Sequence, residues 1–221
     1  MKTLVILFAI CLSSITSKAV VVAQYSFSNT NMLSSDTEVN STAGTLTPVG
    51  FSANSVITTT TGNPSPSYDI YKNDIPQSLT TTKYLEFTIT ANAGRAINFQ
   101  NFTFDATTLN ATKTGNWSIR SSKDSFAADL GTATIAASTA WATQPSVDLT
   151  GALFQNVTNV TFRLYAFNTS GANIDLYVDN LTLNASSVSA VPEPVNVALA
   201  VFGLGFVGIG LGRKLLKKKS A

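Results

Sequence analysis

The central part of the chain alternates between hydrophobic and polar residues with a period of two. In the segment 82–93 (TKYLEFTITANA), Leu85, Phe87 and Ile89 fall on one side, with polar residues between them. Because successive side chains of a strand point to opposite faces, this pattern predicts a strand with one buried face. The same alternation recurs in segments 97–104, 116–122, 159–168 and 174–183. No stretch before Val195 keeps the 3.6-residue period of an amphipathic helix, so the pattern predicts an all-β domain.

Two of these segments change phase midway. The inward positions slip by one residue at Gln100-Asn101 and again at Asp179-Asn180, which predicts a β-bulge in each strand. In the segment 159–168 (NVTFRLYAFN), Arg163 and Tyr165 are predicted to point outward. Turn-forming residues follow at 168–171, and we expect them to join the last two strands as a hairpin.

The number of predicted strands defines the expected architecture. About 165 residues separate two unusual chain ends, which is enough for one domain with its own core. Many strands in one domain favour an antiparallel β-sandwich, and this length favours eight to ten strands in a jelly-roll arrangement. We predict a β-sandwich over residues 24–185, followed by a short linker at 186–191 (SSVSAV).

The composition excludes several kinds of chemistry. The chain has no histidine, and its single cysteine is Cys11 in the N-terminal apolar run. Ser/His/Asp and Cys/His catalysis and Cys/His zinc sites are therefore excluded in the domain. Without the basic chain ends the centre is mildly acidic, which argues against a nucleic-acid partner. The acidic residues Glu38, Asp69, Asp74, Glu86, Asp105, Asp124 and Asp175 are scattered, and nothing in their spacing fixes a glycosidase pair, so we predict no enzymatic activity.

The first residues have the layout of a secretory leader. Lys2 is followed by an apolar stretch at 4–15 and then by small residues. Val21-Val22-Ala23 fits the small-x-small pattern of a cleavage site, and Ala19 marks a second candidate site. We therefore predict a signal peptide over residues 1–23, removed after Ala23.

The C-terminal end has three parts in a fixed order. Pro192-Glu193-Pro194 is followed by an uncharged, glycine-rich stretch at 195–212, long enough to span a bilayer core. A basic tail at 213–219 then contains Arg213, Lys214, Lys217, Lys218 and Lys219. Positive residues stay in the cytoplasm, so the segment is predicted to cross the membrane with the domain outside.

This ending resembles the PEP-CTERM sorting signal, with Val191, Pro192, Glu193 and Pro194 as its processing motif and 192–219 as its full extent. The resemblance implies an exosortase as partner and a transient anchor in the inner membrane of a Gram-negative bacterium. The domain would first face the periplasm and then pass to the cell surface or an extracellular matrix. Two prolines give the motif a rigid, extended backbone that a protease can grip.

The last two predicted strands, FRLYAFN and IDLYVDNLTLNA, resemble the final hairpin of secreted jelly-roll modules related to carbohydrate-binding modules. In such modules an acidic residue at the position of Asp179 helps to hold a structural calcium ion. The resemblance therefore implies a calcium site formed by Asp179 with Asp36 and Glu38. The alternative is that Asp179 caps a β-bulge through its own backbone.

Aromatic residues at predicted outward positions are candidates for stacking on sugar rings. They are Tyr68, Tyr71, Tyr84, Tyr165, Tyr177 and Trp141. The alternative for each is packing in the core or against a neighbouring strand. The first functional hypothesis is a non-catalytic structural protein of the envelope or extracellular matrix. The second is an exopolysaccharide-binding module, and the third is a polysaccharide hydrolase.

Overall fold

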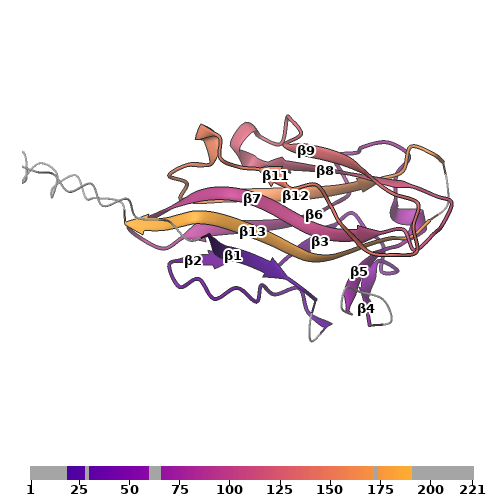
Figure 1. The fold of residues 1–221 in the computed structure, drawn as a ribbon, viewed down its shortest axis with the longest axis horizontal. Coiled ribbons are helices and arrows are strands. Elements are labelled where there is room, and N and C mark those ends of the chain that lie inside the picture. Colours follow the sequence, from indigo (N-terminus) through magenta and orange to yellow (C-terminus); the bar gives the residue numbers. More distant parts are fainter. Residues whose placement is uncertain (1–18, 28–29, 60–65, 172–173, 191–221) are drawn as a thin grey trace, which may run out of the picture.

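The protein folds into two antiparallel β-sheets packed face to face. The computed structural model describes residues 19–27, 30–59, 66–171 and 174–190. Sheet A has seven strands. Five of them lie side by side in the order β10 (Ala142–Thr143), β7 (Arg95–Thr107), β13 (Leu176–Ala190), β5 (Ser67–Ile70) and β4 (Val56–Thr58). The other two pair with strands of this row: β1 (Val20–Tyr25) with β13, and β11 (Val147–Asp148) with β7. The strands β7 and β13 lie toward the viewer in Figure 1.

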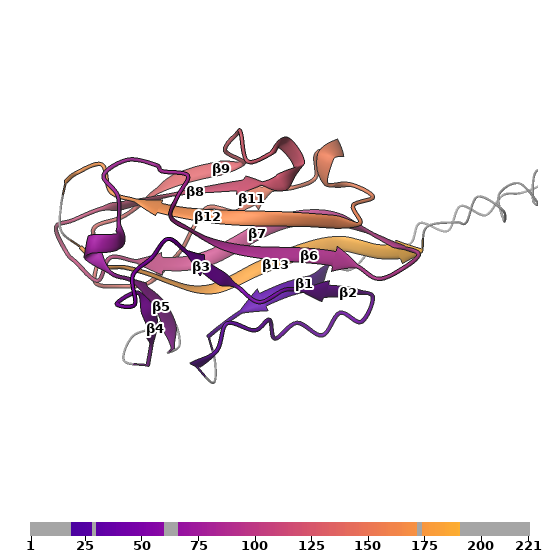
Figure 2. The same ribbon diagram turned by 180° about the vertical axis from the view of Figure 1, so that it is seen from behind.

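Sheet B has six strands and lies toward the viewer in Figure 2. Its order is β2 (Ser41–Ala43), β6 (Tyr84–Ala91), β12 (Asn159–Phe167), β8 (Gly115–Ser121) and β9 (Gly131–Ile135), with β3 (Thr47–Val49) also on β6. Short 3₁₀ turns lie between strands, among them η2 (Lys72–Asp74), η3 (Ser122–Asp124) and η4 (Ala152–Phe154). The predicted all-β, antiparallel two-sheet sandwich is confirmed.

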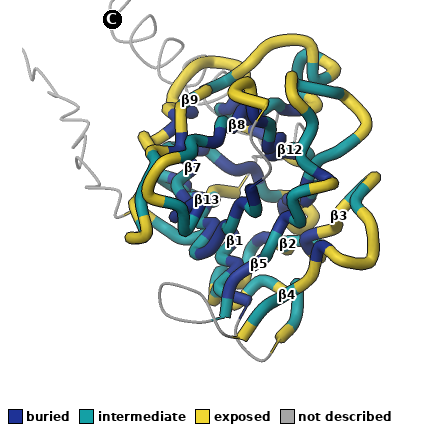
Figure 3. The backbone as a smooth tube through the Cα atoms, turned by 90° about the vertical axis from the view of Figure 1, so that its right-hand side faces the viewer, coloured by how far each residue is buried: buried dark blue, intermediate teal, exposed yellow. Residues whose placement is uncertain are grey.

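The alternation in the sequence matches the burial of the strands. In β6, Leu85, Phe87 and Ile89 are buried, while the residues between them are more exposed. Trp117 and Ile119 of β8 also point into the core, as predicted. Figure 3 shows buried strand segments surrounded by exposed connections. Both predicted bulges are present, because the β7–β13 register is interrupted at Gln100 and between Asp179 and Thr182.

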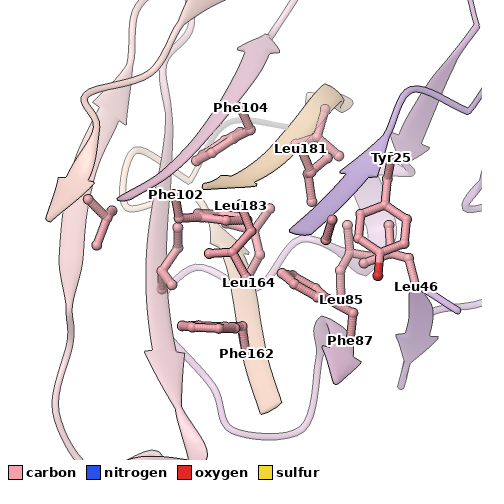
Figure 4. Close-up of a cluster of buried hydrophobic side chains, with 14 of the residues drawn as sticks. Tyr25, Leu46, Leu85, Phe87, Phe102, Phe104, Phe162, Leu164, Leu181 and Leu183 are labelled. Atoms are coloured by element: carbon pink, nitrogen blue, oxygen red, sulfur yellow. The ribbon is translucent and has the colours of Figure 1, made fainter. Parts of the chain in front are cut away.

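Aromatic rings fill the space between the sheets. Phe162 of β12 is completely buried, and its ring stacks with Phe87, Phe102 and Phe154 at centroid distances of 5.7, 6.3 and 6.0 Å. The Phe99 ring contacts the Phe162 ring edge to face, with the ring centroids 5.9 Å apart. Figure 4 shows Phe162, Phe87 and Phe102 together with leucines from both sheets. Rings from β6, β7, β12 and η4 thus form one contact network across the two layers.

The predicted hairpin between the last two strands is wrong. β12 pairs with β6 and β8 in sheet B, whereas β13 pairs with β1, β5 and β7 in sheet A. The chain therefore crosses from one sheet to the other after Phe167. Asn168 holds the start of this crossing, because its Oδ1 accepts hydrogen bonds from the Ser170 backbone N–H at 2.9 Å and the Ser170 hydroxyl at 2.6 Å. Turn residues indicate that the chain changes direction, but they do not indicate in which sheet it continues.

The limits of the domain also differ from the prediction. β1 begins at Val20, inside the predicted leader, and β13 continues to Ala190, through the predicted linker. Val188 pairs with Ile97 and Ala190 with Arg95, so the first part of β7 has its partner here. The Ser- and Ala-rich composition resembled a linker, but small residues are compatible with a strand that pairs on one side.

The predicted sorting motif, membrane segment and basic tail at 192–219 lie outside the described residues. Among the residues that the structure describes, no helix is long and apolar enough to cross a membrane.

Candidate functional site

The structure separates the six candidate stacking residues into buried and accessible ones. The expectation that Tyr68 and Tyr165 are accessible is wrong, because each is only 1% exposed. Tyr68 faces the core of sheet A, where its hydroxyl donates to the Ser55 carbonyl oxygen at 3.1 Å. Tyr165 lies on the outer side of sheet B but is covered by other side chains. The remaining four residues, Tyr71, Tyr84, Tyr177 and Trp141, are partly exposed.

A row of side chains crosses the outer face of sheet A near the beginning of β13. The strand register places Val56 opposite Asp69, Asp69 opposite Tyr177, and Tyr177 opposite Thr107. Their sequence neighbours in β5 and β13 are buried in the core, so Asp69 and Tyr177 point away from it. Val56 is 46% exposed at the edge of the sheet. We call these four residues, with Trp141, the outer row.

Trp141 joins the outer row at its other end. It directly precedes β10, in which Ala142 pairs with Ala106 and Thr143 with Asp105. The Thr143 hydroxyl donates to Asp105 Oδ1 at 2.6 Å on the outer face. Extending this register by one residue sets Trp141 opposite Thr107, on the same side as Thr143. Two strand spacings, roughly 10 Å, then separate Trp141 from Tyr177.

Two carboxylates lie beside Tyr177. Burial, and then the charge of Asp175, raise the pKa of Asp69 to about 6, and its Oδ1 is buried without a hydrogen-bond partner among the described residues. Asp175 Oδ1 accepts the Lys72 backbone N–H at 2.8 Å. Burial and these two acids raise the pKa of Tyr177 to about 12, so its hydroxyl stays protonated at neutral pH. The Lys72 Nζ lies 5.8 Å from the Tyr71 ring centroid at the edge of this group.

The arrangement offers aromatic faces beside hydrogen-bonding groups. Tyr177 and Trp141 provide flat apolar surface, and Asp69 provides an acceptor for which the described part of the chain offers no donor. An unpaired buried acceptor carries a desolvation penalty; the Asp69 side chain as a whole is partly exposed, so its carboxylate also borders the surface of the row. The outer row is therefore suited to a ligand that has both apolar C–H faces and hydroxyl donors.

The raised pKa of Asp69 predicts a pH-dependent stability. The folded protein holds this proton more tightly than the unfolded chain, so the stabilising effect is fully present below about pH 4 and is lost as the pH rises through about 6. We expect Asp69→Asn to raise the free energy of unfolding at pH 8 by on the order of 1 kcal/mol, allowing for solvent screening, with little change at pH 4.5. Urea unfolding at both pH values tests this. An equal change at both would show that Asp69 does not titrate in this range.

The outer face of sheet B carries a different cluster. The Arg163 guanidinium lies between two rings, 4.1 Å from the Tyr84 centroid and 3.7 Å from the Phe126 centroid. Its Nε donates to Glu86 Oε2 at 2.6 Å. Burial works against the charge of Arg163, but the hydrogen bond and charge of Glu86 outweigh it and raise the Arg163 pKa. One face of the Tyr84 ring is therefore already covered by Arg163 of the same chain.

The neighbouring residues of sheet B are also paired with one another. The Arg120 guanidinium carbon lies 5.6 Å from the Tyr165 ring centroid, and its Nε donates to Asp129 Oδ1 at 2.6 Å. Phe126 and Ser125 both have positive φ values, 62° and 60°, in the loop that brings the Phe126 ring over the sheet. Such backbone is disfavoured for residues with a side chain, so the cluster holds this loop in place. Most groups on this face already have partners, which makes it a weaker candidate.

The three predicted calcium ligands do not come together as a site. Among the described residues, no group of three or more acidic, histidine or cysteine side chains is placed to hold a metal ion. Asp36 accepts from the Ser34 hydroxyl and the Glu38 backbone N–H, and Glu38 accepts from Asn40, all within one loop. Asp179 is fully buried, and its Oδ1 accepts the Asn180 N–H at 2.7 Å. This contact is the alternative expectation, a carboxylate that caps the bulge through its own backbone.

The pairing of Asp69 with Asp175 is a feature that sequence reasoning missed. The outward position of Asp69 between Tyr68 and Ile70 is readable from the alternation in SYDI. The closeness of two acids more than a hundred residues apart depends on β5 pairing with β13, which no local pattern reports.

Comparison with known proteins gives likeness of architecture only. No protein-family model matches the chain, and no curated protein shows significant sequence similarity to it. Among solved structures, the K3 cleaved adhesin domain of Lys-gingipain from Porphyromonas gingivalis W83 is similar with a TM-score of 0.43 and 12% identity, over 74% of this chain and 98% of that one. The C-terminal family 22 carbohydrate binding module of Clostridium thermocellum Xyn10B has a TM-score of 0.41 and 10% identity, over 76% and 95%.

Proposed function

We propose that the sandwich is a non-catalytic glycan-binding module and that the outer row of sheet A is its binding surface. The observation that carries this proposal is the combination of the partly exposed rings of Tyr177 and Trp141 with the Asp69 carboxylate, whose Oδ1 has no hydrogen-bond partner among the described residues. A pyranose presents an apolar C–H face to an aromatic ring and hydroxyl donors at its edge, so its chemistry complements this row.

The engagement of Asp175 in a backbone hydrogen bond favours binding over catalysis. The outer row lies on the outer face of sheet A, where Asp69, Tyr177 and Trp141 are partly exposed and Thr107 is buried. Asp175 already accepts a backbone hydrogen bond, so it is engaged in holding η2. We therefore propose that the Asp69–Asp175 pair recognises hydroxyl groups and does not hydrolyse the glycan.

The setting of this function is part of the proposal. The leader and the Pro-Glu-Pro ending support an exported PEP-CTERM protein that an exosortase sorts through a membrane intermediate to the cell surface or matrix. An exopolysaccharide of the producing cell is then the expected ligand. A jelly-roll connectivity fits the crossing between sheets after β12.

Glycan-array screening followed by titration calorimetry tests the proposed surface. We expect the purified protein to bind a polysaccharide, and Tyr177→Ala or Trp141→Ala to weaken binding at least tenfold. One lost ring contact of about 1.5 kcal/mol corresponds to that factor. The same samples should release no reducing sugar from the bound polysaccharide.

Tyr84→Ala is the matched control, since it removes a partly exposed tyrosine from sheet B. It should leave affinity unchanged while circular dichroism shows an intact fold. If Tyr84→Ala abolishes binding and the two outer-row variants do not, the site lies on the other sheet. If no glycan binds, including the native exopolysaccharide, the glycan-binding proposal is wrong. The second candidate, a structural matrix protein, would then be favoured by the low content of charged residues, 12%.

A further inference from the structure

The first strand of the domain begins before the predicted cleavage point. β1 runs from Val20 to Tyr25 and pairs with β13 along its length, from Val20 opposite Ala185 to Tyr25 opposite Leu181. Val22 and Ala23 are completely buried in the core. Four of the six residues of β1 therefore lie on the leader side of a cut after Ala23.

A cut after Ala23 would damage the sandwich in two ways. It would remove two buried side chains and the backbone partners of Ala185, Asn184 and Leu183 in β13. It would also place a charged α-amino group on Gln24, next to the buried Tyr25, whose ring packs on Phe87 at 5.2 Å. In the intact strand the Gln24 N–H donates to Ser34 Oγ at 2.9 Å, and a charged amine at this half-buried position would be partly desolvated beside the apolar core, which is unfavourable.

The second candidate site leaves the strand whole. Ala19 is exposed and precedes β1, so a cut behind it removes no residue of the sandwich. Ser17 and Ala19 supply the two small residues that the small-x-small pattern requires.

We infer that the leader is removed at the Ala19–Val20 peptide bond and that β1 belongs entirely to the mature protein. This inference rests on the proposed export of the chain. The reaction is hydrolysis of one amide bond: water adds its hydroxyl to the Ala19 carbonyl and its hydrogen to the Val20 nitrogen.

The test uses the full chain with its own leader, produced in a Gram-negative host. Intact mass and N-terminal sequencing of the exported protein should show a chain that begins at Val20. Ala19→Leu puts a large residue at the cut and should make uncleaved precursor accumulate, whereas Ala19→Ser keeps a small residue and should be processed normally. Val21→Gln disrupts only the small-x-small pattern that ends at Ala23, so the mature form of this variant should still begin at Val20.

The outcomes separate this inference from the proposal of export. A mature chain that begins at Gln24, and a loss of processing in Val21→Gln but not in Ala19→Leu, would overturn the Ala19–Val20 assignment while leaving export intact. A protein that retains Met1 in every sample would overturn the export proposal itself, and the cleavage site with it.

Discussion

Phe162→Ala is expected to lower the free energy of unfolding by about 3–5 kcal/mol, the range for emptying a buried phenylalanine site. Phe162 is fully buried, and four other aromatic rings contact it. Removing the ring leaves a cavity at the point where both sheets meet. The surrounding rings come from β6 in one sheet, β7 in the other and the η4 turn, so they are unable to collapse together into the space.

Thermal and urea unfolding followed by circular dichroism measures this effect. For a domain of this size, the loss corresponds to a fall in Tm on the order of 10 °C. Phe162→Leu is the matched control, because it keeps most of the volume and should cost less than half as much. A change below about 1 kcal/mol for Phe162→Ala would show that the aromatic network does not carry the packing between the sheets.

Asp74→Ala is expected to cost about 3 kcal/mol and to loosen the β4–β5 end of sheet A. The Asp74 carboxylate is nearly buried, and its Oδ2 accepts the Ser52 N–H at 2.8 Å, the Ser52 hydroxyl at 2.7 Å and the Ser55 hydroxyl at 2.6 Å. Its Oδ1 accepts the Lys83 ammonium at 3.1 Å. Alanine would leave these donors without their acceptor.

The ionisation of Asp74 makes the expected loss of stability in Asp74→Ala depend on pH. Burial alone would raise its pKa, but the hydrogen bonds from Ser55, Ser52 and Lys83 outweigh burial and lower it to about 2. The folded pKa lies below the unfolded value, so this stabilisation is present above about pH 4 and is lost as the pH falls through 2. The difference between wild type and Asp74→Ala should therefore shrink in acid.

Exposed Asp148 offers the control for Asp74. Asp148→Ala removes a carboxylate that accepts hydrogen bonds from the Thr150 N–H and hydroxyl in its own turn, and its effect should stay within about 0.5 kcal/mol. Equal losses of unfolding free energy in Asp74→Ala and Asp148→Ala would show that the hydrogen bonds of Asp74 stabilise the fold no more than those of an exposed aspartate. Because β4 and β5 carry Val56 and Asp69, Asp74→Ala should also weaken glycan binding if the outer row is the site.

Local alternation predicted the longer strands well because each of them has a buried face. β6, β8 and β12 follow their segments closely, and both bulges fall where the pattern slips. The partner of each strand was not predictable in the same way. The turn after Phe167 reads like a hairpin, yet it leads into the other sheet, because pairing is decided by packing across the whole domain.

The same limit applies to the candidate site. Outward tyrosines were identified by alternation, but exposure also depends on what covers a face. Tyr165 points outward and is nevertheless buried under Arg120 and Tyr84. The place of Asp69 beside Tyr177 and near Asp175 depends on the pairing of β5 with β13, which the alternation within one strand does not reveal.

The pairing of β1 with β13 also decides how the domain is presented to its surroundings. The strands are antiparallel and Val20 lies opposite Ala185, so both ends of the described chain leave from one pole of the sandwich (Figure 1). Tyr177 is near the start of β13, thirteen residues before Ala190, or roughly 40 Å away along the strand. A domain tethered through either end would hold its outer row at the far tip, turned away from the point of attachment.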